Sequence, residues 1–324
     1  MLTLEVGVLD LSRVRFAISP MWELTASLRV LRDPGAHPVH LSWVRQAREA
    51  LPGIRLELLP PLVTGHPSQL PGFLAPAPTS PLADVGDEIR AVAEADPAVV
   101  RREVRSLFGN RVPESLRPFV TAPRRALRSL AGELERYWEA VVAPHWPRME
   151  GLLQGDVVHR GRALASDGPA AMFGALDPTI AWTGSAVTVD KRGLEGRHVL
   201  GGRGLVLVPS LFSWPTVWVK AAEPYDPVIR YPARGVGALW ESPGPPPDLA
   251  ASLGPTRARL LELLGDPMTT TELARVTGLA PGGVSDHLAR LVRSGLAARH
   301  RHGRTVAYLR TARAEALVRD TPAS

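Results

Sequence analysis

The sequence contains no cysteine, which excludes disulfide bonds, cysteine-ligated zinc and thiolate-based sensing. Long apolar runs are also missing, and no stretch approaches the ~18 apolar residues of a membrane-spanning helix. Near the N-terminus, Glu5, Asp10 and Arg13 interrupt any apolar core of the kind that a signal peptide needs. We therefore expect a soluble, cytoplasmic protein with no metal and no cofactor.

Lysine is scarce, because it occurs only at Lys191 and Lys220, and arginine supplies nearly all of the 38 basic residues. The formal net charge is +6, a mildly basic balance that permits a nucleic-acid partner without requiring one. Arginine pairs with phosphate and guanine better than lysine does. A GC-rich genome, which favours arginine codons, also explains the excess, and composition alone favours that explanation.

A proline-rich segment, Ser242–Asp248, divides the chain into two expected domains, because proline cannot continue a helix or a central strand. All eight tryptophans and all six phenylalanines precede this segment, and the one aromatic residue after it is Tyr308. The sequence therefore predicts an N-terminal α+β domain at 1–242, with an effector-binding or dimerisation role, and a C-terminal domain at 248–318.

In the N-terminal part, helical patterns come first and strand patterns later. Helical periodicity predicts helices at Ser19–Val30, Ala83–Phe108 with a break at Pro97, Pro123–Val142 and Pro147–Ala165. Short segments rich in valine, isoleucine and tryptophan predict a small antiparallel sheet from Ile180–Val189, Gly204–Val208, Pro215–Val219 and Val228–Tyr231. Leu59–Pro81 is expected to be irregular, and His37 and His40 are expected to lie exposed in a loop.

The C-terminal part begins with two expected helices joined by a tight turn. Pro255–Leu264 forms the first, and a capping box of Thr269 and Glu272 opens the second, Thr270–Thr277. Gly278 suits the left-handed position that ends such a helix. The apolar side chains of Leu273, Val276 and Leu279 are expected to face the core.

A third expected helix, Pro281–Ser294, has a buried stripe and an opposite face that is small and polar. Val284, Leu288 and Leu291 recur at helical spacing on the buried side. Because a recognition helix reads bases with its N-terminal residues, the candidates for base contacts are Gly282, Gly283, Ser285, Asp286 and His287. Taken alone, this face is more typical of an ordinary solvated helix than of a DNA-reading one.

A basic hairpin follows this helix and favours a recognition helix over an ordinary solvated one. Leu296–Arg301 and Thr305–Arg310 alternate as two strands, and His302-Gly303 is typical of a hairpin turn. Helix-turn-helix followed by a basic hairpin is the order of a winged helix-turn-helix. The candidates for contacts with the DNA backbone are Thr270, Arg290, Arg299, Arg301, His302 and Arg304. A solvated edge hairpin protected by charge is the alternative.

Residues 269–310 resemble the winged helix-turn-helix regulators of the ArsR type. The resemblance rests on the combination of Leu273-Ala274, Gly278-Leu279, Val284-Ser285-Asp286-His287-Leu288, Leu291, Gly295-Leu296 and Gly303-Arg304. It implies a dimer that binds a pseudo-palindromic operator, usually as a repressor. The chain lacks the cysteine metal box of that family, so thiolate metal sensing is excluded.

The N-terminal part resembles a domain found on a subgroup of actinobacterial ArsR-type regulators, in the segments Arg15–Val30, Leu205–Trp214 and Tyr231–Trp240. This resemblance implies no particular chemistry. Tryptophans are candidates to line a pocket for an apolar effector, with core packing as the alternative. They are Trp182, Trp214, Trp218 and Trp240.

The sequence therefore predicts a DNA-binding transcriptional regulator, a homodimeric repressor whose N-terminal domain senses a small ligand. Two alternatives stay open. One is a DNA-binding protein without an effector, whose large domain recruits partners. The other is an enzyme with a helix-turn-helix-like interaction module, although we find no convergent set of acid, base and nucleophile and expect no catalysis.

Overall fold

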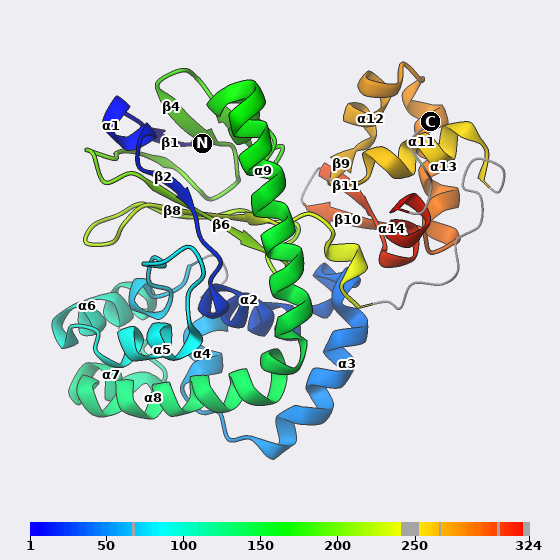
Figure 1. Cartoon of the computed structure of the whole chain (residues 1–324). Helices are drawn as coiled ribbons and strands as arrows, with labels where there is room; N and C mark the ends of the chain where they lie inside the picture. Colours follow the sequence, from blue (N-terminus) through cyan, green and yellow to red (C-terminus); the bar gives the residue numbers. More distant parts are fainter. Residues whose placement is uncertain (67–68, 110, 241–252, 266, 303–304, 320–324) are drawn as a thin grey trace. The chain divides into compact units, whose positions relative to one another are not determined.

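The structure is a computed structural model that describes residues 1–66, 69–109, 111–240, 253–265, 267–302 and 305–319 (Figure 1). The chain divides into two compact units. Unit 1 comprises Met1–Arg32 and Arg45–Pro232, and unit 2 comprises Asp33–Val44 and Ala233–Ser324. The predicted linker, Ser242–Asp248, lies outside the described residues. Among the described residues, no helix is both long enough and apolar enough to cross a membrane.

The division into units differs from the one expected from the sequence, because a short N-terminal segment belongs to unit 2. Within unit 2, the rings of Trp43 and Trp240 stack with their centroids 6.0 Å apart. Trp240 Nε1 also donates a hydrogen bond of 2.8 Å to Nδ1 of His40. Such contacts join residues about two hundred positions apart, so a boundary read along the chain cannot anticipate them.

Unit 1 contains two four-stranded sheets, which confirms the α+β class. One has the order β3-β4-β1-β5, from β1 (Leu2–Glu5), β3 (Ile180–Trp182), β4 (Ala186–Val189) and β5 (Gly196–Val199). The other has the order β2-β6-β8-β7, from β2 (Val14–Phe16), β6 (Leu205–Ser210), β7 (Trp218–Lys220) and β8 (Val228–Pro232).

The strand pairing differs from the single antiparallel sheet that the sequence predicts. The pairs β1–β5, β2–β6 and β6–β8 are parallel, and the other pairs are antiparallel. Strands β1 and β2 come from the first sixteen residues, where the sequence reasoning expected no strand. Their partners lie nearly two hundred residues away, so no pattern near the N-terminus identifies them.

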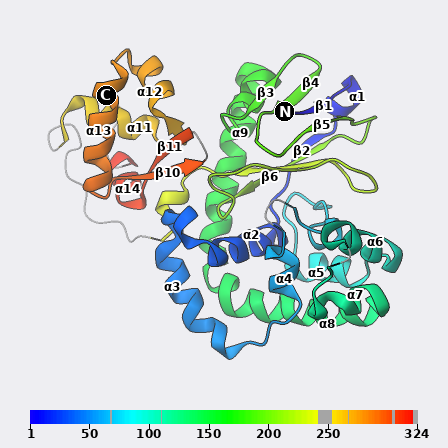
Figure 2. The same cartoon turned by 180° about the vertical axis from the view of Figure 1, so that it is seen from behind.

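Helices accompany the sheets of unit 1 (Figures 1 and 2). Helix α2 is buried along most of its length, and Ser19 Oγ caps its start by accepting a hydrogen bond from Trp22 N. The helices of this unit are α1 (Val8–Leu11), α2 (Pro20–Arg32), α3 (Leu41–Ala50, of which residues up to Val44 belong to unit 2), α4 (Leu59–Thr64), α5 (Val85–Ala93), α6 (Pro97–Phe108), α7 (Arg117–Thr121), α8 (Pro123–Tyr137, continued by a π-helical turn at Trp138–Val142) and α9 (Trp146–Gly174).

The core of unit 1 joins both sheets to α9. Leu4, Val187, Leu207 and Ile229 on the strands form one buried cluster with Phe173 near the end of α9. Burying apolar side chains of this size contributes roughly 1.5–3 kcal/mol each. The two sheets and α9 are therefore held as one body, which fixes the positions of the side chains between them.

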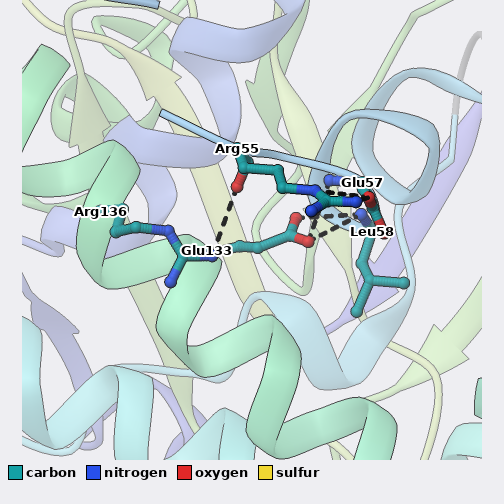
Figure 3. A network of polar contacts seen from close by, with 5 residues as sticks. All are labelled: Arg55, Glu57, Leu58, Glu133 and Arg136. Carbon is teal, nitrogen blue, oxygen red and sulfur yellow. Dashed lines mark hydrogen bonds and ion pairs between the residues drawn. The ribbon is translucent and has the colours of Figure 1, made fainter. Parts of the chain in front are cut away.

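A buried carboxylate joins α8 to α4 (Figure 3). The two oxygens of Glu133 accept hydrogen bonds from the backbone N–H groups of Glu57, Leu58 and Leu59, at 2.8 to 3.1 Å. The first N–H groups of a helix have no partner within it and attract negative charge. Glu133 satisfies the N–H group of Leu59, the first residue of α4, and those of the two residues before it. The sequence predicts an irregular segment where this helix lies.

Unit 2 contains a three-stranded sheet with helices around it (Figure 1). In chain order its elements are α11 (Pro255–Leu263), β9 (Met268–Thr269), α12 (Thr270–Thr277), α13 (Pro281–Arg293), β10 (Ala297–His302), β11 (Thr305–Arg310) and α14 (Ala312–Arg319). The sheet has the order β10-β11-β9, and both pairs are antiparallel. The elements and their order agree with the predicted winged helix-turn-helix.

Candidate nucleic-acid interface

The turn between α12 and α13 has the geometry that the sequence predicts. Thr269 Oγ1 accepts a hydrogen bond from Glu272 N at 3.2 Å, and Glu272 Oε2 accepts one from Thr269 N at 2.7 Å. This reciprocal capping box begins α12. Gly278 ends the helix with φ +71°, and its N–H donates to the carbonyl of Ala274 at 2.9 Å. A glycine adopts this conformation without the strain that a side chain would add.

A buried stripe holds α13 in place. Val284, Leu288 and Leu291 are each at most 1% exposed and contribute to one core with α11 and α12. Two predicted core contacts are wrong, because Val276 is 52% exposed and Leu279 is 37% exposed. The buried side of the short helix α12 is centred on Leu273 and Ala274, about a third of a turn from Val276. Leu279 follows the turn and lies at the surface.

The opposite face of α13 presents small and polar groups to solvent. Gly282, Gly283, Ser285 and Asp286 are exposed, and His287 is half-buried. A Cβ atom added at either glycine would meet nothing within 4 Å, so packing inside unit 2 does not require glycine there. The N-terminal half of α13 is thus open to close approach by another molecule.

Basic side chains continue this surface onto the hairpin. Arg290 is exposed on α13, and Arg299 and Arg301 are exposed on β10. These two arginines alternate with the buried His300, so they share one face of the strand. Thr270, the first residue of α12, is half-buried. Sequence reasoning missed two further exposed arginines, Arg275 and Arg293, in the last turns of α12 and α13.

Part of the predicted wing lies outside the part of the chain that the structure describes. Gly303 and Arg304 lie outside the described residues, and so does the side chain of His302, although its backbone ends β10. The described strands pair in register, with Arg299 opposite Tyr308 and Arg301 opposite Val306. This basic surface has little negative charge. Among the exposed candidate residues, the acidic one is Asp286.

The buried face of β10 meets the N-terminal segment that belongs to unit 2. The rings of His37 and His300 have centroids 6.4 Å apart. His40 is fully buried, which corrects the expectation that both His37 and His40 lie exposed in a loop. The reason is Trp240, whose indole packs edge-on against His40 and donates a hydrogen bond to it. Among the described residues, no group of three potential metal ligands occurs.

The four tryptophans predicted to line a pocket do not lie together. Trp218 lines a cavity of about 450 Å³ in unit 1. Trp214 is fully buried, and Trp182 stacks on Phe173 with ring centroids 5.5 Å apart. Trp240 belongs to unit 2. Of the four predicted tryptophans, Trp218 lines this cavity, and Trp182, Trp214 and Trp240 are not among its lining residues.

Two family models match separate parts of the chain. A family model described as a helix-turn-helix domain matches residues 253–300. The chain carries a helix-turn-helix domain of the kind found in DNA-binding regulators. A second model, described as a family of unknown function (DUF5937), matches residues 79–237. No curated protein and no solved structure matches the chain.

Proposed function

We propose that this protein is a sequence-specific transcriptional regulator in which α13 enters the major groove of DNA. The observation that carries the proposal is the open, polar N-terminal half of α13, held by a buried stripe beside exposed arginines on β10. The major groove is about 12 Å wide and admits one α-helix. In this arrangement Ser285 and Asp286 contact base edges, and Asp286 accepts a hydrogen bond from cytosine N4.

The exposed arginines of β10 contact phosphates alongside this helix. Arg299 and Arg301 lie on one face of the strand, so both guanidinium groups can follow the same stretch of backbone. Phosphate contacts fix the orientation of a protein on the duplex but carry no sequence information. We assign specificity to α13 and the salt-dependent part of affinity to the hairpin.

We further propose that the protein acts as a homodimeric repressor. The support is the resemblance of residues 269–310 to ArsR-type regulators, which bind two half-sites. A dimer with this geometry recognises half-sites about one helical turn apart, near 10–10.5 base pairs. We propose a sensory role for unit 1, in which a ligand binds the DNA-competent and DNA-incompetent states with different affinities.

The decisive experiment is selection of bound sequences from random duplexes by the full-length chain. We expect an enriched, pseudo-palindromic sequence with the stated spacing. Ser285→Ala and Asp286→Ala should alter the preferred bases, and Asp87→Ala, an exposed carboxylate on α5, should leave them unchanged. Selection that enriches nothing, or preferences that survive both changes in α13, would contradict the proposal.

Dimerisation and repression need separate measurements. Sedimentation equilibrium should give the mass of two chains plus one duplex when the enriched duplex is bound. A reporter gene placed behind the enriched sequence should be transcribed less when the protein is present. A monomer on DNA or increased transcription would remove the corresponding part of the proposal.

A further inference from the structure

Unit 1 contains a cavity whose walls are largely apolar but whose charged groups are unusual. It lies between α2, α6, β7, β8 and the segments at 69–75 and 193–198, and its volume is about 450 Å³. Sites for small molecules commonly measure roughly 300–1,000 Å³. The indoles of Trp22 and Trp218 and the side chains of Leu70 and Leu107 provide apolar surface.

Arg230 is the buried charge of this cavity. Its side chain comes from β8, directly opposite Trp218 on β7, and the residue is 3% exposed. Nη1 donates to the carbonyl of Trp22 at 3.1 Å, but Nε has no hydrogen-bond partner among the described residues. A guanidinium group has five donors, so the described contacts leave most of its capacity unused.

The nearby acid Glu23 is engaged by hydrogen-bond donors other than Arg230. Glu23 attracts Arg230 electrostatically, but its carboxylate accepts hydrogen bonds from Ser210 Oγ, Leu211 N and Phe212 N. Another buried arginine of unit 1 shows the contrast. Arg160 lies 3.5 Å from the carboxylate of Asp156, so that charge has a paired counter-ion. A buried charge without close pairing costs several kcal/mol.

Other basic side chains surround the indole of Trp218. Arg29 lies 4.5 Å from the ring centroid of Trp218, Lys191 Nζ lies 5.3 Å away, and Arg230 lies 5.2 Å away. Arg29 donates to the backbone carbonyls of His66 and Gln69. Burial and the positive charges of Arg230 and Arg29 lower the pKa of Lys191 to about 8, against the opposing attraction of Asp177. The cluster therefore repels itself, and an anion would relieve this repulsion.

The amine of a lysine also lines the cavity, beside an acid that is already engaged. Lys220 Nζ donates to the carbonyls of Gly72 and Ala75 at 2.7 and 2.8 Å. Glu103 attracts Lys220, but its carboxylate accepts hydrogen bonds from Tyr225 Oη at 2.5 Å and Phe73 N at 3.0 Å. The other acids on the lining, Glu195 and Glu223, are exposed to solvent.

We propose that this cavity binds a small organic carboxylate, whose charged group pairs with Arg230 and whose apolar body lies against Trp218. A planar carboxylate matches the planar guanidinium fork, which can donate two parallel hydrogen bonds to it. The indoles provide a large apolar surface for the rest of the ligand. An inorganic anion would use the charges and leave this surface uncovered.

Occupancy of the cavity does not depend on DNA binding, and its regulatory consequence rests on the proposed function. In that case a bound carboxylate changes the affinity of the full-length chain for its selected duplex. Binding is therefore measured without DNA first, and the effect on DNA is measured second. A carboxylate that binds without changing the affinity for DNA would support the carboxylate site and contradict the sensory role of unit 1.

The first test uses the unaltered full-length protein and matched probes in isothermal titration calorimetry. The probes are benzoate, 2-naphthoate and octanoate, the neutral amides of the same three acids, and inorganic phosphate. At least one carboxylate should bind at least about tenfold more tightly than its amide and than phosphate, because only it satisfies both charge and apolar surface. Equal binding of acid and amide, binding of phosphate as tight as that of the acids, or no binding of any carboxylate at millimolar concentration would overturn the proposal.

The second test assigns the site to its residues. Arg230→Gln and the less buried Arg29→Gln should each weaken carboxylate binding by about tenfold or more, while Arg128→Gln, an exposed arginine on α8, should not. Circular dichroism checks that each variant is folded. Full affinity in a folded Arg29→Gln and a folded Arg230→Gln would contradict the assignment.

A measurement on the unaltered protein covers the case in which Arg230→Gln does not fold. Burial lowers the pKa of Lys220 to about 7, so its amine is mostly uncharged at pH 8 and can be acetylated. The chain has only two lysines, which makes the modified position easy to identify by mass spectrometry. The carboxylate that binds should slow acetylation of Lys220 several-fold, and its amide should not. Unchanged acetylation at a saturating concentration would place the ligand elsewhere.

Discussion

Removing the arginines of β10 should change how DNA binding responds to salt. Each phosphate contact made by a protein contributes about −0.9 to the slope of log K against log salt. Arg299 and Arg301 are both exposed on one face of β10, so Arg299→Ala with Arg301→Ala removes two such contacts. The slope should become shallower by about 1.8, and a fourfold rise in salt should then cost about tenfold less affinity than it costs the unaltered protein.

Fluorescence anisotropy with the selected duplex, at several salt concentrations between 50 and 200 mM, measures this slope. A duplex of unrelated sequence should lose affinity in parallel, because phosphate contacts carry no sequence information. Arg124→Ala with Arg128→Ala is the matched control, since both side chains are exposed on α8 and the change in net charge is the same. A slope that stays the same in the β10 variant, or changes equally in the control, would refute the phosphate assignment.

Three further predictions concern α13, α12 and buried carboxylates. Gly282→Ala and Gly283→Ala each place a methyl group in open space on a helix, so each should raise the free energy of unfolding in urea by up to about 1 kcal/mol. Each should also weaken DNA binding, because the methyl group would stand between the helix and the duplex. Tighter binding would argue against close approach of DNA. Thr269→Ala removes the capping hydroxyl of α12 and should lower stability by about 0.5–2 kcal/mol, and no loss would show that the capping box is dispensable. Burial raises the pKa of Glu23 and of Glu88 from an ordinary value near 4.5 to about 7, so the folded state binds more protons than the unfolded state between these values. Stability should therefore fall as the pH rises from 5 to 7, by up to roughly 3 kcal/mol per group, and Glu88→Gln should flatten this fall; an equally steep fall in the variant would exclude Glu88 as a cause.

The helix-turn-helix could be predicted from the sequence because its determinants are local. The capping box spans Thr269 to Glu272, and the turn depends on the backbone of one residue, Gly278. The buried stripe of α13 repeats within seven residues, from Val284 to Leu291. Each signal acts over at most two helical turns, so packing elsewhere in the chain has little power to override it.

The parts that could not be predicted depend on partners far away in the chain. Strand β1 pairs with β4 and β5, and nothing within Leu2–Glu5 identifies those partners. The local sequence around His40 is typical of a loop, but the indole of Trp240, two hundred residues later in the chain, covers its side chain. Tryptophan content indicated that a pocket was possible, but which indole lines it depends on strand register, which places Trp218 opposite Arg230.

The arginine excess, which codon usage seemed sufficient to explain, has two different structural outcomes. Codon bias accounts for exposed arginines anywhere on the surface, where they cost little, and Arg299 and Arg301 alone would not argue against it. It does not account for Arg230, because burying a guanidinium with an unpaired donor is costly and a neutral side chain would avoid that cost. A bound anion that pairs with Arg230 would offset this cost, which is the role that we propose for the carboxylate. On this argument, a folded Arg230→Gln variant should bind carboxylates at least about tenfold more weakly than the unaltered protein, while its affinity for the matching neutral amides should change little.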